Sequence, residues 1–326
     1  MKRNLTLATS AAALVVALAA SGQAATLYSQ NFDVDDTANW TVNDSGLSDI
    51  GVDFFYDYSA IGVPAAPGGA STTGLKMTAN NSGGVFSGFS VSPTGQSFSG
   101  NYRVEFDVWQ NYVGPVGPGG SGTTQLSMFG VGTAGNVPVW AGGSTSENVA
   151  FGVTLDGGSA SDYRAYSSAA PTSYVGGDPV YLAPSTAGNR NGSDAYYSGF
   201  GGASAPGDQV TLFPAQTGTT DAGEIAFTWA HGAIDIINNF ATFSIDGLPI
   251  AKVDLSTVTL GGGNILFGHG DTNGSSSSDP NDSLLNVTLI DNVVVTSVPE
   301  PGSVSLSAIA AFGAIAAIRR RRSARR

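Results

Sequence analysis

The stretch that decides the fold is Tyr102-Arg103-Val104-Glu105-Phe106-Asp107-Val108-Trp109-Gln110, in which apolar and polar side chains alternate. Successive side chains of an extended strand point to opposite faces of the sheet. We therefore expect Val104, Phe106 and Val108 to face a core. The opposite face then carries the other side chains of the run, Arg103, Glu105, Asp107 and Trp109.

Short runs of this kind recur along the chain between turn-rich segments, which is typical of an all-β sandwich. The expected strands are Thr26–Phe32, Asp53–Ser59, Gly74–Thr78, Val85–Val91, Tyr102–Tyr112, Thr124–Val131, Val149–Leu155, Val210–Phe213, Glu224–Trp229, Phe240–Ile245, Pro249–Val253, Asn264–Gly268 and Leu284–Thr296. Asp246-Gly247 predicts a type I′ hairpin turn, because glycine adopts a positive φ at little cost. No linker divides these runs, so we predict a single antiparallel β-sandwich.

The composition agrees with this fold class and limits the partners. The chain has 45 glycines, which disfavour helices, and no cysteine, so neither disulfides nor thiolate chemistry contributes. Between Ala25 and Val298 there are five basic and 24 acidic residues, a net charge of −19. Such a surface repels nucleic acid and anionic lipid and favours solubility or cation binding. We therefore expect no nucleic-acid partner.

The first residues resemble a secretory signal peptide. Lys2 and Arg3 precede an apolar stretch from Ala11 to Ala20, and small residues stand at Gly22 and Ala24. A positive start, a short apolar region and small residues at −3 and −1 predict export and cleavage by signal peptidase after Ala24. The alternative is a retained anchor helix.

The last residues, 298–326, form a second targeting segment. Pro299-Glu300-Pro301 precedes an apolar run from Val304 to Ile318, and the chain closes on an arginine cluster between Arg319 and Arg326. This order of parts resembles the PEP-CTERM sorting signal, which implies recognition and removal of the tail by a membrane-embedded exosortase. The alternative is an ordinary C-terminal membrane anchor, since arginines stay on the cytoplasmic side.

The two ends give the predicted organisation of the chain. Residues 1–24 are the signal peptide, 25–297 the extracellular β-sandwich, and 298–326 the sorting tail with its transmembrane helix. We expect an exported protein that is held at the membrane through this helix, transiently or permanently. Its destination is then the cell surface or the extracellular matrix.

The domain between the two ends resembles the concanavalin A-like lectin/glucanase sandwich. The residues that carry the resemblance are the opening Ser29–Asp33, the hairpin Phe243–Gly247 and the closing Leu289–Val295. It implies a jelly-roll arrangement of strands. A jelly-roll carbohydrate-binding module would have the same pattern.

Glu105 and Asp107 are similar to part of the catalytic strand of laminarinase-type glucanases, in which a nucleophilic Glu, an Asp and an acid/base Glu share one strand. The third position is Gln110 here, and an amide cannot deliver the proton that the leaving sugar oxygen needs. Three interpretations remain: a working hydrolase, a binding-only face made of Glu105, Asp107 and Trp109, and a charged outer face without a ligand.

Two sets of acidic residues could bind calcium. Asp271, Asn273, Asp279 and Asp282 lie in a polar segment with ligand spacing close to that of an EF-hand loop, but Ser276 stands where that loop needs glycine. Asp33 and Asp291 form a second candidate pair by analogy with jelly-roll modules. The alternative for the first set is a solvated polar loop.

Aromatic and imidazole side chains allow fewer conclusions. Six tyrosines between Asp156 and Asp221 could stack on sugars or pin long loops to the sandwich, and we prefer pinning; they are Tyr163, Tyr166, Tyr174, Tyr181, Tyr196 and Tyr197. His231 and His269 have no zinc-binding spacing, so we predict structural roles for both.

These observations leave three functions. The first is a non-catalytic envelope or matrix protein that binds extracellular polysaccharide. The second is a glycoside hydrolase of the glucanase type, which Gln110 disfavours. The third is a purely structural matrix protein without a ligand.

Overall fold

A computed structural model describes residues 24–46, 49–81, 87–113, 125–140, 147–155, 162–167, 189–190, 192–271 and 280–299. The sandwich is one compact unit, Tyr28–Val295, and the two ends of the chain, Met1–Leu27 and Thr296–Arg326, form a second unit. Nearly all of the predicted signal peptide and sorting tail, including Glu300 and Pro301, lies outside the described residues. No helix among the described residues is long and apolar enough to cross a membrane.

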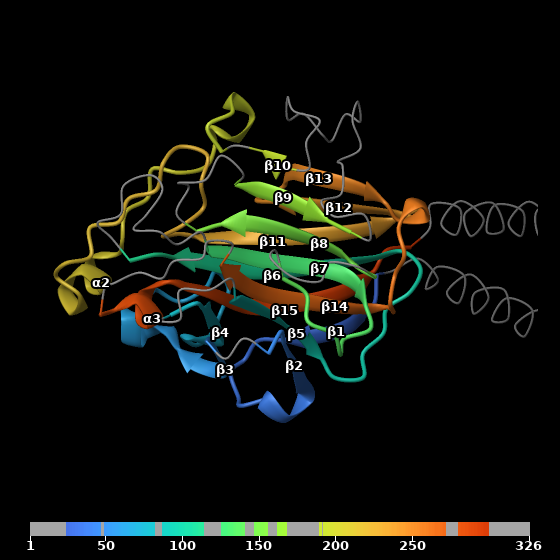
Figure 1. The fold of residues 1–326 in the computed structure, drawn as a ribbon, viewed down its shortest axis with the longest axis horizontal. Coiled ribbons are helices and arrows are strands. Elements are labelled where there is room, and N and C mark those ends of the chain that lie inside the picture. Colours follow the sequence, from blue (N-terminus) through green and yellow to red (C-terminus); the bar gives the residue numbers. More distant parts are fainter. Residues whose placement is uncertain are drawn as a thin grey trace, which may run out of the picture. The chain divides into compact units, whose positions relative to one another are not determined.

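The strands form two sheets, as Figure 1 shows. Sheet A has the order β13-β12-β11-β6-β15-β4-β3, and β1 also pairs with β15; sheet B has the order β10-β9-β8-β7-β14-β5-β2. The strands of sheet A are β1 (Thr26–Gln30), β3 (Ile50–Asp57), β4 (Thr73–Ala79), β6 (Tyr102–Asn111), β11 (Trp229–Ile237), β12 (Phe240–Ile245), β13 (Leu248–Asp254) and β15 (Val287–Ser297). Those of sheet B are β2 (Trp40–Asp44), β5 (Ser87–Pro93), β7 (Gln125–Thr133), β8 (Val149–Thr154), β9 (Tyr163–Tyr166), β10 (Asn189–Arg190) and β14 (Asn264–Asp271).

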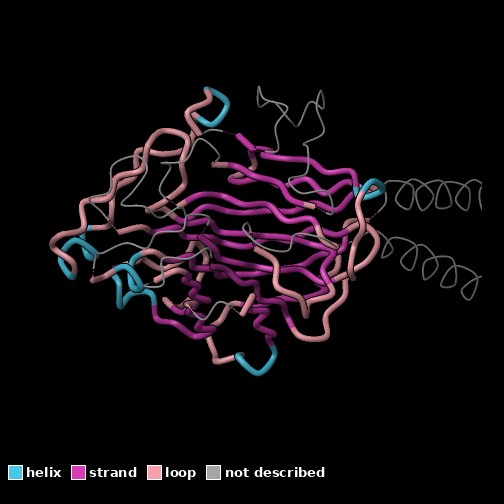
Figure 2. Tube along the Cα trace, in the orientation of Figure 1, coloured by secondary structure: helices cyan, strands magenta, loops and turns pink. Residues whose placement is uncertain are grey.

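Among the described residues, helices are short and lie in connections between strands, as Figure 2 shows. The 3-10 helices are η2 (Thr37–Asn39), η3 (Tyr58–Ile61), η4 (Ala195–Tyr197) and η5 (Leu255–Thr257), and the α-helices are α2 (Gly207–Leu212) and α3 (Asp282–Leu285). Each strand pair of known register is antiparallel, for example β6 with β11 and β7 with β14. The prediction of an all-β, antiparallel sandwich of two sheets is confirmed.

The core between the sheets is built from the inward faces that the alternation predicts. Val104, Phe106 and Val108 of β6 are at most 1% exposed. The ring of Phe106 packs 4.7 Å from Phe129 of β7 and 5.1 Å from Phe267 of β14, centroid to centroid. Gly232 of β11 leaves the space for this ring, because a Cβ there would come within 2.3 Å of Phe106. The burial of these rings, together with the aliphatic residues around them, stabilises the sandwich.

The hairpin prediction is also confirmed. Ile245 pairs with Leu248 across a two-residue loop, and both loop residues have positive φ, 48° at Asp246 and 78° at Gly247. Two positive φ values define the type I′ turn, whose twist matches that of the flanking strands.

Two predicted strands are wrong. Val210–Phe213 belongs mostly to helix α2, where the Val210 amide donates to the Pro206 carbonyl at 2.9 Å. A run of four residues is too short to separate strand from helix, and Pro206 favours a helix start because its φ is already near the helical value. Glu224–Trp229 is not a strand either, since β11 only begins at Trp229.

Candidate functional site

The outer faces of the two sheets differ in chemistry. The outer face of sheet B is an apolar cluster, made of Met128, Val139, Trp140, Ala150, Tyr166 and Leu266. The indole of Trp140 lies directly on this face, and Gly88 makes room for it, because a Cβ there would meet the indole at 2.7 Å. Among the described residues, this face therefore offers little polar surface to a ligand.

The outer face of sheet A carries the charged residues of β6. The register pairs Asp107 with His231, Glu105 with Ala233 and Arg103 with Asp235. Directly opposed residues of an antiparallel pair lie on the same face of the sheet. His231 and Asp235 of β11 therefore join the three charged side chains of β6, and Ala233 between them is buried, at 1% exposed.

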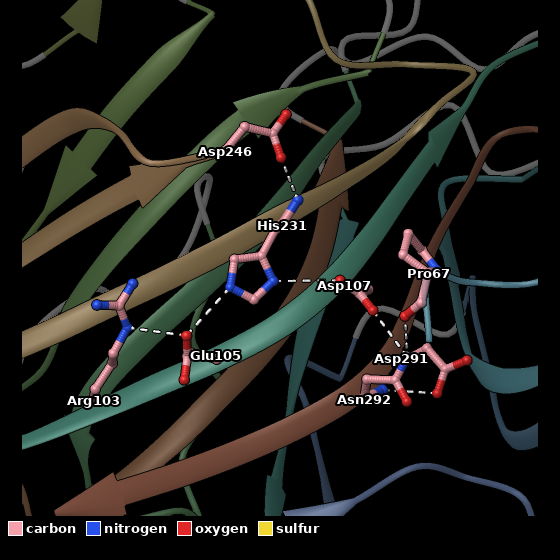
Figure 3. A network of polar contacts seen from close by, with 8 residues as sticks. All are labelled: Pro67, Arg103, Glu105, Asp107, His231, Asp246, Asp291 and Asn292. Carbon is pink, nitrogen blue, oxygen red and sulfur yellow. Dashed lines mark hydrogen bonds and ion pairs between the residues drawn. The ribbon is translucent and has the colours of Figure 1, made fainter. Parts of the chain in front are cut away.

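His231 lies between the two carboxylates of β6, as Figure 3 shows. Its Nε2 is 3.4 Å from Oε1 of Glu105, and its Nδ1 is 3.4 Å from Oδ1 of Asp107. The side chain of His231 is 47% exposed and that of Glu105 33% exposed, but that of Asp107 only 9%. These distances are longer than a normal hydrogen bond, so the imidazole is held loosely.

A β-bulge in β15 brings two further polar residues to this face. Ile290 and Val293 both face the core, so two residues, Asp291 and Asn292, stand where regular alternation leaves one. Asn292 has a φ of +51°, which is typical of such an irregularity. Its Nδ2 donates to Oδ2 of Asp107 at 2.9 Å and to the carbonyl of Pro67 at 3.4 Å.

Asp291 lies beside Asn292 on β15, beneath the polar side chains of the outer face, and is only 2% exposed. Its Oδ1 accepts from its neighbour, the Asn292 amide, at 2.7 Å, and its Oδ2 accepts from the Tyr58 hydroxyl at 3.1 Å. Burial, with smaller contributions from the charges of Asp107 and Asp33, raises the pKa of Asp291 to about 6. This carboxyl group is therefore protonated under mildly acidic conditions.

Arg103 lies at the end of this set of polar side chains that is opposite to Asn292. Its Nε is 3.2 Å from Oε1 of Glu105, and its Nη1 is 3.6 Å from Oδ1 of Asp235. Burial raises the pKa of Asp235, and the Arg103 charge opposes this shift. The guanidinium is thus shared between two carboxylates of the same face.

Trp109, predicted as part of the binding face, is not accessible to a ligand. Trp109 does lie on the outer face of β6, but it is 2% exposed and belongs to a second apolar cluster with Tyr58, Ile61 and Leu289. Gln209 of α2 closes this cluster by donating to the carbonyl of Ile61 at 2.9 Å and to Oδ1 of Asn111 at 3.0 Å. Segments distant in sequence therefore cover Trp109.

Trp229 is the partly exposed tryptophan of this face. It lies opposite Trp109 on β11, and its indole nitrogen donates to the carbonyl of Pro64 at 2.8 Å. The ring packs edge-on against Tyr58 and Trp109, with centroids 5.3 and 5.8 Å away. The hydrogen bond and the two ring contacts fix the orientation of the indole, two residues from His231 on the same side of the strand.

Gln110 faces the opposite way from Glu105 and Asp107. It is fully buried between the sheets, where its Nε2 donates to Oγ of Ser127 at 2.7 Å and to the carbonyl of Val153 at 3.0 Å. The register of β6 with β11 shows no shift from Tyr102 to Trp109, so regular alternation turns position 110 inward. A carboxylate at this position would not reach the outer face either.

The candidate calcium residues do not form a described site. Asp271 is the last residue of β14, and its buried carboxylate accepts from Nδ2 of Asn80 at 2.7 Å. Asp282 begins α3 and is also buried, whereas Asn273 and Asp279 lie outside the described residues. No three His, Cys, Asp or Glu side chains in the described part of the chain are grouped to hold a metal ion. Calcium binding by these residues or by Asp33 and Asp291 stays a prediction.

The tyrosines that the structure describes have structural contacts. Tyr163 and Tyr197 are buried and stack with ring centroids 4.3 Å apart, and the Tyr196 hydroxyl donates to the carbonyl of Pro249 at 2.6 Å. Tyr166 lies in the apolar cluster on sheet B. These four pin their segments to the sandwich, as preferred, while Tyr174 and Tyr181 lie outside the described residues.

Sequence reasoning missed His231 and Trp229 as members of the site. The signal was present, because Trp229, His231, Ala233 and Asp235 alternate with Ala230, Gly232, Ile234 and Ile236. Ala230 and Gly232 weaken the apolar half of that alternation and Ala233 weakens its polar half, so the strand was not predicted.

Comparisons with known proteins assign this chain to no family. No protein-family model matches the chain, and no curated protein matches it. Among solved structures, the chain is similar to a Bacillus subtilis protein with a galectin-like fold, at 10% identity and a TM-score of 0.41, over 85% of this chain and 97% of that one. It is also similar to the carbohydrate recognition domain of Emp46p in its potassium-bound form, at 12% identity and a TM-score of 0.39, over 82% of this chain and 95% of that one. A glycoside hydrolase family 16 endo-glucanase from Bacteroides ovatus matches at 14% identity and a TM-score of 0.39, over 82% and 99%. Similarity at this level carries no argument about function.

Proposed function

We propose that this chain is an exported bacterial envelope or matrix protein that binds polysaccharide, without cleaving it, on the outer face of β6 and β11. One observation carries the proposal: the oriented, partly exposed indole of Trp229 stands beside the polar row of Glu105, His231 and Asp107. Sugar rings present apolar faces to aromatic side chains and hydroxyl groups to donors and acceptors. This face supplies both.

Binding without cleavage is the interpretation that Gln110 supports. A retaining glycosidase needs a nucleophilic carboxylate and a second carboxyl group that donates and then accepts a proton. Position 110 holds an amide that faces the interior, so it cannot take the second role.

One observation favours a second candidate function, glycan cleavage. The imidazole of His231 lies 3.4 Å from Glu105, and a histidine can act as a general acid or base. A hydrolase of this kind would use Glu105 and His231 in place of two carboxylates. Release of reducing sugar that disappears in Glu105→Gln would support it.

Export and sorting are part of the proposal. The signal peptide at residues 1–24 and the Pro299-Glu300-Pro301 tail at residues 298–326 support processing by signal peptidase and an exosortase. A purely structural role in the matrix remains the alternative if the face binds nothing.

The test of polysaccharide binding is a glycan array probed with the exported protein and two variants. Trp229→Ala is expected to weaken binding roughly tenfold, since an aromatic contact contributes about 1 kcal/mol or more. Phe55→Ala is the matched control, because Phe55 is 44% exposed on β3, three strands away from β6 in sheet A. Equal binding by all three proteins would contradict the proposed face, and the absence of binding to any glycan would contradict the function.

A further inference from the structure

We infer that the polysaccharide carries free amino groups, so that the outer face of β6 and β11 binds a cationic glycan such as a polymer with unacetylated hexosamine units. The inference rests on the proposed function and names the ligand class for the same site. It follows from the charges of the face, from the contacts that occupy its cations, and from the position of Trp229.

Carboxylates outnumber cations on this face. Glu105, Asp107 and Asp235 lie along β6 and β11, and Asp53 of β3 lies on the same side of sheet A, opposite Lys76. The basic residues of sheet A that share this side are Arg103, Lys76 and Lys252, and each is already engaged. Arg103 is shared by two carboxylates, Lys76 lies opposite Asp53 and 4.4 Å above the Tyr56 ring, and Lys252 lies 4.4 Å above the Phe240 ring.

This distribution disfavours an acidic glycan. A uronate or sulfate group would need a cation of its own, or it would be left beside the carboxylates of Glu105 and Asp107. The net charge of −19 between Ala25 and Val298 adds a long-range repulsion of the same sign. A neutral glycan meets no repulsion and can donate hydroxyl groups to the carboxylates, but it brings no positive charge of its own.

The loose contacts of His231 leave room for an ammonium group. Both of its carboxylate contacts are 3.4 Å long, whereas an ammonium nitrogen bonds a carboxylate at about 2.7–2.9 Å. The imidazole is nearly half exposed, so it can turn away when a stronger donor arrives. An amino sugar would then donate to Glu105 and Asp107 in its place.

Trp229 is an independent reason to expect a cation. Its indole lies two residues from His231 on the same side of β11, and tryptophan is the best aromatic partner for a cation over its ring. One hexosamine unit can therefore stack on the indole and direct its ammonium group to the carboxylates.

The experiment measures by calorimetry how tightly the exported protein binds three tetrasaccharides. They are the tetramers of glucosamine, of N-acetylglucosamine and of galacturonate. Mildly acidic buffer keeps the glucosamine amine protonated. We expect the glucosamine tetramer to bind at least about tenfold more tightly than its acetylated form at low salt, and this advantage to shrink as salt is added. The galacturonate tetramer is expected to bind most weakly.

Two variants assign the effect to the face. Glu105→Gln should reduce the preference for glucosamine over N-acetylglucosamine several-fold. Asp208→Asn removes an equal charge from an exposed position on α2 and should leave the preference unchanged. Thermal melts of both variants check that they are folded.

The outcomes separate this inference from the proposed function. Equal or tighter binding of the N-acetylglucosamine tetramer overturns the amino-glycan inference and leaves polysaccharide binding intact. A preference for glucosamine that persists in Glu105→Gln also overturns it, because the charge would then lie elsewhere. No binding of any tetramer, together with no signal on the glycan array, contradicts the proposed function itself.

Discussion

The two histidines of this chain lie on neighbouring sheets but in opposite surroundings. His231 is half exposed on the outer face of sheet A, with two contacts of 3.4 Å. His269 is fully buried between the sheets, with Nδ1 2.8 Å from Oγ1 of Thr288 and Nε2 2.5 Å from Oε1 of Gln125. The comparison separates a side chain that maintains the fold from one that a ligand can displace.

The hydrogen bonds around His269 form a chain with a fixed direction. Gln125 donates through its Nε2 to the carbonyl of Ala79, so its Oε1 accepts, and the proton of His269 is assigned to Nε2. Nδ1 of the imidazole then accepts from the Thr288 hydroxyl. Thr288 in turn accepts from Ser127, and Ser127 accepts from Gln110.

This directed chain explains why Gln110 is an amide rather than an acid. An ionised carboxylate could not donate to Ser127 and the Val153 carbonyl, and it would be a buried charge without a counter-ion in the chain. The interior of the sandwich thus determines the identity of residue 110, and its inward orientation keeps it from acting on the outer face.

Two tryptophans provide the largest expected contrast between interior and outer face. Trp109→Ala should destabilise the fold by about 3–5 kcal/mol, because it removes a buried ring from a closed cluster. Trp229→Ala should cost less, because its ring is already partly exposed, yet it should weaken glycan binding. Denaturant unfolding of both variants measures the difference. A larger stability loss in Trp229→Ala would reverse the assignment of the two side chains.

The pH dependence of stability sharpens the comparison through His269 and Asp291. Burial lowers the pKa of His269 to about 3, below its ordinary value of 6.5. The neutral imidazole therefore contributes fully to the free energy of unfolding above about pH 6.5, and this contribution is lost as the pH falls from 6.5 toward 3. The pKa of Asp291 is raised to about 6, so the folded state binds a proton between about pH 4 and 6 that the unfolded chain does not bind. Acidification through that range therefore stabilises the fold through Asp291, and the two effects oppose each other.

Asp291→Asn should expose the effect of His269. Relative to the wild-type protein, the variant is expected to lose about 1–2 kcal/mol of unfolding free energy as the pH falls from 6 to 4. The measurement is urea unfolding at several pH values, with Asp208→Asn as a matched control for a lost surface charge. Parallel pH profiles of wild type and Asp291→Asn would show that Asp291 is not held in its protonated form.

Local sequence patterns predicted most of the fold. The alternation in residues 102–110 identified the core side of β6, and Asp246-Gly247 identified the hairpin, because both depend on neighbouring residues only. The pattern also placed Glu105 and Asp107 together on an outer face, as the structure has them.

The rest of the site depends on contacts between distant residues. Burial of Trp109 requires η3 and α2 to pack over it, and the sequence around residue 109 indicates neither of these contacts. The place of Asn292 beside Asp107 depends on a bulge in β15, and His231 reaches Glu105 only through the pairing of β6 with β11. None of these long-range relations can be read from one strand at a time.

Oxidative footprinting of the four tryptophans tests the central claim most directly. All four lie in the described part of the chain, and Trp40, Trp109 and Trp140 are at most 6% exposed, whereas Trp229 is partly exposed. We predict that hydroxyl radicals oxidise Trp229 fastest in the free protein, and that a saturating amount of the best-binding glycan protects it while the other three stay unchanged. Saturated binding with undiminished oxidation of Trp229 would contradict the claim that the outer face of β6 and β11 is the binding site.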